Sequence, residues 1–228
     1  MEKQNSYTHI LKYTGLFGGV QGINILVGLV RNKLVALILG TMGMGLLALY
    51  SSTIKLVGDS TNLGLAISAV RDISAAYESG DRQKLERRIA VFRHWCLLTS
   101  LLGFVVCLAM APWLDEWTFS SGSHTLQFML LAPVVGFTTF SSGELAILKA
   151  TRQLQAVAVS SLYLAIATLL LSVPIYYVWG NGGVVPSLVV VTLAQMLIAM
   201  RFSMRAYPMR LRLSHSLMKE DYLSLIHI

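Results

Sequence analysis

Long apolar stretches separated by short polar segments dominate the chain. Most of these stretches have at least the ~20 residues that a helix needs to cross the hydrocarbon of a membrane. They cover residues 11–39, 46–70, 91–111, 128–148, 154–178 and 186–200. The pattern predicts an all-α integral membrane protein whose six transmembrane helices form one bundle within residues 1–212.

The segment between the second and third stretches follows a different pattern. Gly80 and Asp81 form a break, after which Leu85, Ile89 and Phe92 recur at helical spacing on one face. We expect short helices here that lie at the inner surface of the membrane and contact its anionic lipids.

The composition also indicates a lipid environment. Of the 228 residues, 55% are hydrophobic and only 13% are charged, so the chain cannot cover itself with a polar surface in water. A formal charge of +7 is also typical of nucleic-acid-binding proteins. Here, however, the cations lie at the ends of the apolar stretches and form no single patch. They therefore indicate membrane topology and no nucleic-acid partner.

The positions of Lys and Arg predict the orientation of the chain. Segments 40–45, 112–127 and 179–186 contain neither residue, whereas 71–93, 149–152 and the residues after 200 contain most of the 18. Cytoplasmic loops are the ones enriched in Lys and Arg. We therefore expect a multi-pass protein of the bacterial inner membrane with a cytoplasmic N-terminus.

Three cations are exceptions, because Arg31, Lys33 and Lys55 fall within the first two apolar stretches. Lys55 and Asp59 lie about 14 and 20 Å from the outer end of the second predicted helix, near the middle of the membrane. Both belong to one polar face of that helix. We call this face the second stripe, because it lies in the second apolar stretch. Its residues are Ser51, Ser52, Lys55, Asp59 and Asn62.

The charges of the second stripe allow two interpretations. A charged side chain at the centre of a membrane costs about 2.5 to 3.5 kcal/mol to insert. Lys55 and Asp59 could neutralise each other and only fix the packing of the helices. Alternatively they line a transport cavity. We favour the cavity because ionisable groups within a membrane usually mark the path of a substrate or an ion.

Another polar face, the first stripe, occupies the first apolar stretch. It comprises Gln21, Asn24, Gly28 and Arg31, which fall within about 80° of arc on a helix. Two such stripes on adjacent antiparallel helices predict one shared cavity. Arg31 and Lys33 could instead end a shorter helix, which would place both cations outside. One long helix agrees better with the absence of cations from the outer segments.

Glu144, in the fourth stretch, also has two interpretations. It could pair with Lys149 at the cytoplasmic end of the same helix. Otherwise it is a protonatable group at the inner mouth of a cavity, because burial favours the neutral form of a carboxyl group. In that case Glu144 and Asp59 are the candidates for coupling transport to the movement of an ion.

No motif in the sequence indicates an enzyme. There is no H-E-x-x-H, no G-x-S-x-G and no pair of carboxylates at the end of a predicted helix. The five His and two Cys lack the spacing of metal ligands. We therefore predict no catalytic residues, no metal and no cofactor. A purely structural membrane protein is a further alternative, and it would tolerate the loss of both Lys55 and Asp59.

Two segments carry a resemblance to a known family. The run KLVALILGTMGMGLLALYSSTIKLVGDSTNLGLAISAV has a glycine-containing turn after a long first helix, and ELAILKATRQLQAVA joins the fourth and fifth stretches. Both resemble polysaccharide and O-antigen flippases of the MATE-like MOP exporter superfamily. The resemblance covers nearly all of residues 1–212, although its motifs are diffuse.

The resemblance implies a transporter of two six-helix bundles with a cation-lined central cavity that alternates access. Such proteins flip undecaprenyl-pyrophosphate-linked oligosaccharides for O-antigen, capsule or exopolysaccharide. The chain would be the N-terminal bundle. Its partners would be this lipid-linked oligosaccharide, membrane lipids, the second bundle and glycan polymerase machinery. The implied cavity residues are Arg31, Lys33 and Lys55 as ligands of the pyrophosphate, with Asp59, Gln21, Asn24 and Asn62 beside them.

Two other transporters of that superfamily are alternatives. A multidrug or cation antiporter needs an acidic cavity, which the excess of cations in the first two stretches disfavours. A peptidoglycan-precursor flippase also binds a pyrophosphate and needs the same cations. We expect residues 213–222 to begin a cytoplasmic linker to the second bundle. The final LSLIHI, residues 223–228, matches the translation of a sequencing-library adapter, so we expect the natural gene to continue past Tyr222.

Overall fold

The computed structural model describes residues 2–62, 64–119 and 124–208, with side chains from residue 18 onward except Ala66. Within this part every element is a helix, which confirms the predicted all-α fold. The elements are α1 (Glu2–Asn62), α2 (Leu65–Glu78), α3 (Arg82–Phe119), α4 (Thr125–Met129), α5 (Ala132–Ala150), α6 (Leu154–Trp179), the 3₁₀ turn η1 (Gly180–Gly183) and α7 (Val184–Ala206). The predicted linker and the terminal LSLIHI lie outside the described residues.

Four helical stretches are long and apolar enough to cross a membrane. They are Gly18–Asn62, Arg82–Phe119, Thr125–Ala150 and Leu154–Ala206. By length and composition, this agrees with the membrane character that the hydropathy pattern predicts.

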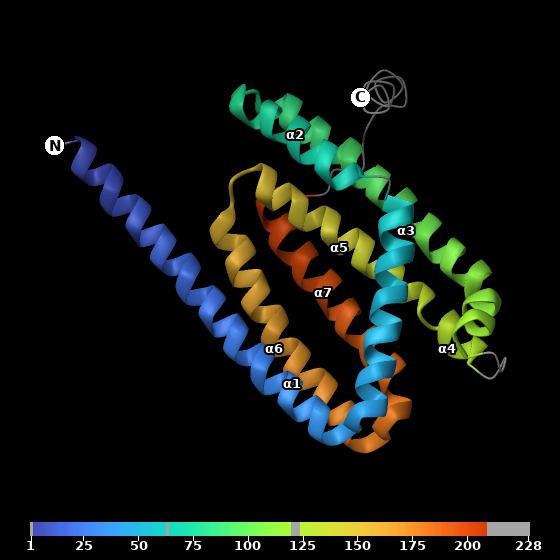
Figure 1. Cartoon of the computed structure of the whole chain (residues 1–228). Helices are drawn as coiled ribbons and strands as arrows, with labels where there is room; N and C mark the ends of the chain where they lie inside the picture. The colour runs from blue at the N-terminus through green and yellow to red at the C-terminus, as the bar shows by residue number, and fades with distance from the viewer. Residues whose placement is uncertain (1, 63, 120–123, 209–228) are drawn as a thin grey trace.

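Two of the four stretches contain a reversal of the chain. Within α1, Gly40 has φ 65° and ψ −168°, a conformation that is essentially restricted to glycine. Figure 1 shows α1 descending from the N-terminus and then returning as a second helical segment. Gly180, at φ 54°, ends α6, and η1 leads the chain back into α7. The Gly40 turn falls within the predicted outer segment 40–45.

Two boundaries differ from the predictions. The second predicted stretch, 46–70, is interrupted at Gly64, which has φ 70° and immediately precedes α2. The third stretch begins earlier than predicted, because α3 continues from Arg82 into the apolar region without a break. No Gly or Pro separates the charged start of α3 from its apolar part, so the polar residues do not end the helix.

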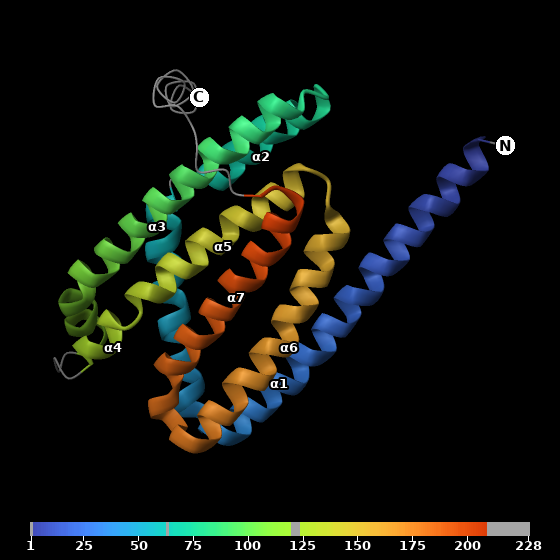
Figure 2. The same cartoon turned by 180° about the vertical axis from the view of Figure 1, so that it is seen from behind.

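The bundle has two apolar cores. The first joins both halves of α1 to α3, α4, α5, α6 and α7 around Leu39, Tyr50, Phe128 and Tyr176. We call this end of the bundle the bend end, because it contains Gly40. The second core joins α2, α3 and α5 around Ile73, Phe92 and Ile147, with methionines of α7 against it. We call that end the α2 end. In both views the first half of α1 lies beside α6 (Figures 1 and 2).

Small residues allow the central helices to approach closely. A methyl group on Gly103 of α3 would lie 2.9 Å from Thr61 Oγ1 and 3.0 Å from Val135 Cγ1. A methyl group on Gly143 of α5 would collide with the Cys96 sulfur on α3. Helices in membranes commonly associate through small residues, because lipid supplies no hydrophobic force between them.

Candidate functional site

The second stripe lies on an uncovered face of α1. After Gly40, one side of this helix is buried in the core through Tyr50, Ile54, Val57 and Thr61. The opposite side exposes Ser51, Ser52, Lys55 and Asp59, and Asn62 is half-buried. The helix therefore packs with its apolar face and leaves its charges without cover from the described chain.

Lys55 and Asp59 do not neutralise each other in this structure. In the part of the chain that is described, neither side chain forms an ion pair or a hydrogen bond. Residues four apart on a helix are close enough to pair if their side chains turn toward each other. Both charges are therefore available to a partner that covers this face.

The first stripe faces α6. Asn24 Nδ2 donates a hydrogen bond to Ser161 Oγ at 2.9 Å, and Arg31 Nε lies 3.5 Å from the oxygen of the buried Ser172. Gln21, one turn before Asn24, is exposed. Part of the predicted cavity lining therefore contributes to packing between α1 and α6. Among the described side chains, no hydrogen bond or ion pair joins the first stripe to the second.

The three exceptional cations lie at different distances from Gly40. By helical rise, Lys33 and Arg31 are about 10 and 14 Å from it along the first half of α1. Lys55 is about 22 Å from it along the second half. Lys33 is exposed and lies about 200° around the helix from Arg31. The cations thus span several depths of the bundle.

Glu144 has a partner that the sequence did not suggest. Its carboxylate accepts from Arg93 Nε at 3.0 and 3.2 Å and from Arg93 Nη2 at 3.0 Å. Only 3% of Arg93 and 1% of Glu144 is exposed. Of the two interpretations of Glu144, the pairing with Lys149 is not the one found here. Lys149 is exposed, and five residues of helix direct it away from Glu144.

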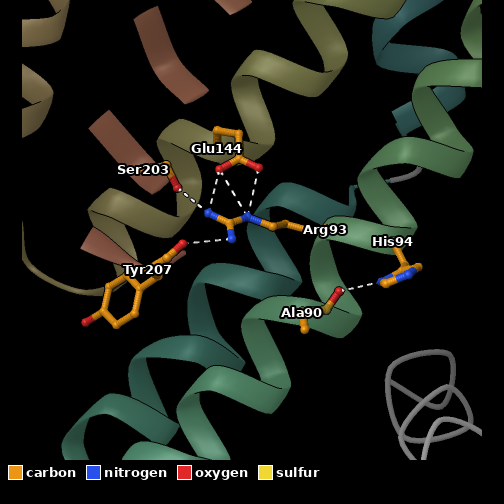
Figure 3. A network of polar contacts seen from close by, with 6 residues as sticks. All are labelled: Ala90, Arg93, His94, Glu144, Ser203 and Tyr207. Carbon is orange, nitrogen blue, oxygen red and sulfur yellow. Dashed lines mark hydrogen bonds and ion pairs between the residues drawn. The ribbon is translucent and has the colours of Figure 1, made fainter. Parts of the chain in front are cut away.

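Arg93 also binds α7. Its Nη2 donates to Ser203 Oγ at 2.9 Å, and its Nη1 donates to the backbone carbonyl of Tyr207 at 2.9 Å (Figure 3). We call Arg93, Glu144 and these two acceptors the buried clamp. Arg93 belongs to segment 71–93, which the cation pattern assigns to the cytoplasmic side. Its position four residues after Ile89, on the apolar face of the helix, is the signal that could have identified it.

A second buried carboxylate lies near the bend end. Asp115 of α3 is completely buried, and its Oδ2 accepts from the backbone N–H of His124 at 3.0 Å and from Thr125 Oγ1 at 2.6 Å. Tyr50 of α1 donates to Gln127, which also contacts the His124 ring. These contacts fix the start of α4 against α3 and α1, so we assign Asp115 a structural role.

The described residues contain no cluster of three or more His, Cys, Asp or Glu that could hold a metal ion. Comparison with known proteins finds no matching family model, no matching curated protein and no matching solved structure. The resemblance to flippases therefore stays a prediction. The uncovered second stripe is the feature of the described chain that best suits a functional site.

Proposed function

We propose that the chain forms one six-helix bundle of a flippase for undecaprenyl-pyrophosphate-linked oligosaccharides in the bacterial inner membrane. The observation that carries the proposal is the exposed position of Lys55 and Asp59 within an apolar stretch. Charged groups at membrane depth normally face protein or water, because lipid cannot solvate them. A substrate cavity beside the second stripe meets that requirement.

The reversals of the chain support six crossings. Turns at Gly40 and Gly180–Gly183 divide two of the four apolar stretches into antiparallel segments. Counting these segments together with α3 and α5, we propose six membrane-crossing helices. The cations Arg71, Lys84 and Lys149 are exposed near the α2 end, which we assign to the cytoplasm.

The charges favour an anionic headgroup. Lys55 is a compact cation without an ion-pair partner in the described chain, and attraction to a pyrophosphate is strengthened where water is excluded. Lys33 is exposed as well, and among the described residues Arg31 has one hydrogen bond, a long one to Ser172. Cations at several depths can bind the pyrophosphate successively during its passage. A cationic drug would be repelled by the same residues, which disfavours an antiporter.

Asp59 provides the opposite charge one turn from Lys55. As an exposed carboxylate it is suited to bind a proton or a cation whose movement drives transport. A second bundle of the same protein would cover the stripe and form the other wall of the cavity. The same wall would shield the charges from lipid. Glycan polymerase machinery would then receive the flipped oligosaccharide.

Complementation tests the proposal. We expect the completed gene, which includes the predicted second bundle, to restore surface glycan in bacteria that lack their own O-antigen flippase. Lys55→Ala should abolish this restoration at equal membrane abundance. Lys149→Ala removes an exposed cation outside the stripe and should retain activity. Equal restoration by Lys55→Ala and the wild type, or none by the wild type, would contradict the proposal. Rescue of a strain lacking its peptidoglycan-precursor flippase would instead identify the other pyrophosphate substrate.

A further inference from the structure

The buried clamp connects three helices that are far apart in the sequence. Arg93 is on α3, Glu144 is on α5, Ser203 is on α7, and the Tyr207 carbonyl immediately follows α7. Figure 3 shows the guanidinium between the carboxylate and the two other acceptors. An Arg side chain has five N–H groups, and all three of its nitrogens donate here, to four acceptor oxygens. Both charges are therefore satisfied inside the protein.

Each charge of the pair depends on the other at this site. Arg93 and Glu144 are both buried, so removing either charge, as in Glu144→Gln, would leave the other buried without a counter-charge. Breaking a buried pair in this way is strongly destabilising. Asp59, in contrast, is exposed and has no ion-pair partner in the described chain.

The surroundings of the clamp are apolar. Phe92, Cys96, Phe140 and Ile147 are buried in the core at the same end of the bundle. The thiol of Cys96 lies near both charges of the pair, and Tyr77 and Arg82 lie near Tyr207. His94 bonds the Ala90 carbonyl on another side of α3, away from the pair (Figure 3).

We infer that the Arg93–Glu144 ion pair is a clamp that keeps α3, α5 and α7 together at the α2 end in every working state. Glu144 is then a positioning residue and does not couple transport to an ion. The part of this inference that concerns coupling rests on the proposed flippase function. The clamp itself does not, and it can be tested without any transport assay.

The two native cysteines allow a direct test of the clamp. Cys96 is one helical turn from Arg93 and packs against Gly143, next to Glu144, whereas Cys107 is buried in the other core. After Cys107→Ala, labelling by a membrane-permeant maleimide reports the opening of this region alone. Lys149→Cys, in a chain without native cysteines, shows that the reagent reaches the α2 end.

We expect Cys96 to stay protected from mildly acidic to mildly alkaline pH, with and without a proton gradient. Glu144→Gln should label about tenfold faster or more, because the region opens more often. The double variant Arg93→Met with Glu144→Met should restore protection, since it removes both charges and fills a similar volume. Wild-type labelling that rises with acidification, or unchanged protection in Glu144→Gln, would overturn the clamp.

The double variant also tests the role of Glu144 in coupling. If Glu144 only positions helices, the protected double variant should restore surface glycan as well as the wild type does. If it remains protected but loses glycan export, the carboxylate takes part in transport and the inference is wrong. Failure of the wild type in complementation would refute the flippase proposal alone, because the labelling results would still decide whether the clamp exists.

Discussion

The strength of the Arg93–Glu144 interaction can be measured by a double-mutant cycle. Glu144→Gln preserves the shape of the side chain but removes the charge opposite a guanidinium that is only 3% exposed. Breaking one partner of a buried pair costs about 3 to 5 kcal/mol. Folded proteins are commonly stable by about 5 to 15 kcal/mol. The variant should therefore lose a large part of its unfolding free energy.

Arg93→Met should have a similar effect, because it leaves the Glu144 carboxylate buried without its cation. The double variant with Met at both positions should be close to the wild type in stability, since well-packed apolar residues often replace a buried pair without loss. The effects of the single variants Arg93→Met and Glu144→Met, which complete the cycle, would then be strongly non-additive. Independent sites add within about 0.3 to 0.5 kcal/mol.

The assay is reversible unfolding in mixed detergent micelles, followed by circular dichroism or tryptophan fluorescence. Lys149→Gln is the matched control, because this exposed residue on α5 should change stability by about 0.5 kcal/mol or less. Ser203→Ala removes one hydrogen bond to the guanidinium and should cost about 1.5 to 3 kcal/mol. If the effects of Arg93→Met and Glu144→Met simply add, the energetic argument for the clamp fails.

Three further predictions concern helix packing. Gly103→Ala should destabilise the bundle by about 1 to 3 kcal/mol, because the new methyl group lies 2.9 Å from Thr61 Oγ1. Adding Thr61→Ser to this variant should leave that strain largely in place, since Ser keeps the same oxygen. Gly40→Ala should cost about 1 to 3 kcal/mol, since its backbone conformation suits only glycine; an unchanged unfolding midpoint would argue against the turn. Asn24→Ala and Ser161→Ala should each cost about 0.6 kcal/mol, with a non-additive double variant; additivity would show that their hydrogen bond contributes nothing.

Hydropathy was enough to predict most of the helices. The predicted stretch 154–178 and α6 (Leu154–Trp179) nearly coincide, because a long apolar run bounded by Gly180 needs no knowledge of its neighbours. The reversal at Gly40 likewise falls in a predicted outer segment. Boundaries beside charged residues were less predictable. The start of α3 at Arg82 is set by Asp81, whose carboxylate accepts from the backbone N–H groups of Gln83 and Lys84, and hydropathy does not register such a polar first turn.

The two polar stripes also differ in how much of their surroundings the sequence could predict. The second stripe could be predicted because Ser51, Lys55 and Asp59 belong to one helix, whose periodicity places them on one face. The first stripe could be predicted as a face as well. That this face turns toward α6 was decided by Ser161, which is 137 residues from Asn24 in the sequence.

The sequence by itself therefore determined the apolar helices, their turns and the polar face that carries Lys55 and Asp59, since each depends on neighbouring residues and helical periodicity. Only the tertiary structure decided that Arg93 is buried and that its partner is Glu144, 51 residues away. A cation at the end of an apolar helix can be solvated by water or satisfied inside the protein. Which of these is lower in free energy depends on whether another helix brings a counter-charge within hydrogen-bonding distance.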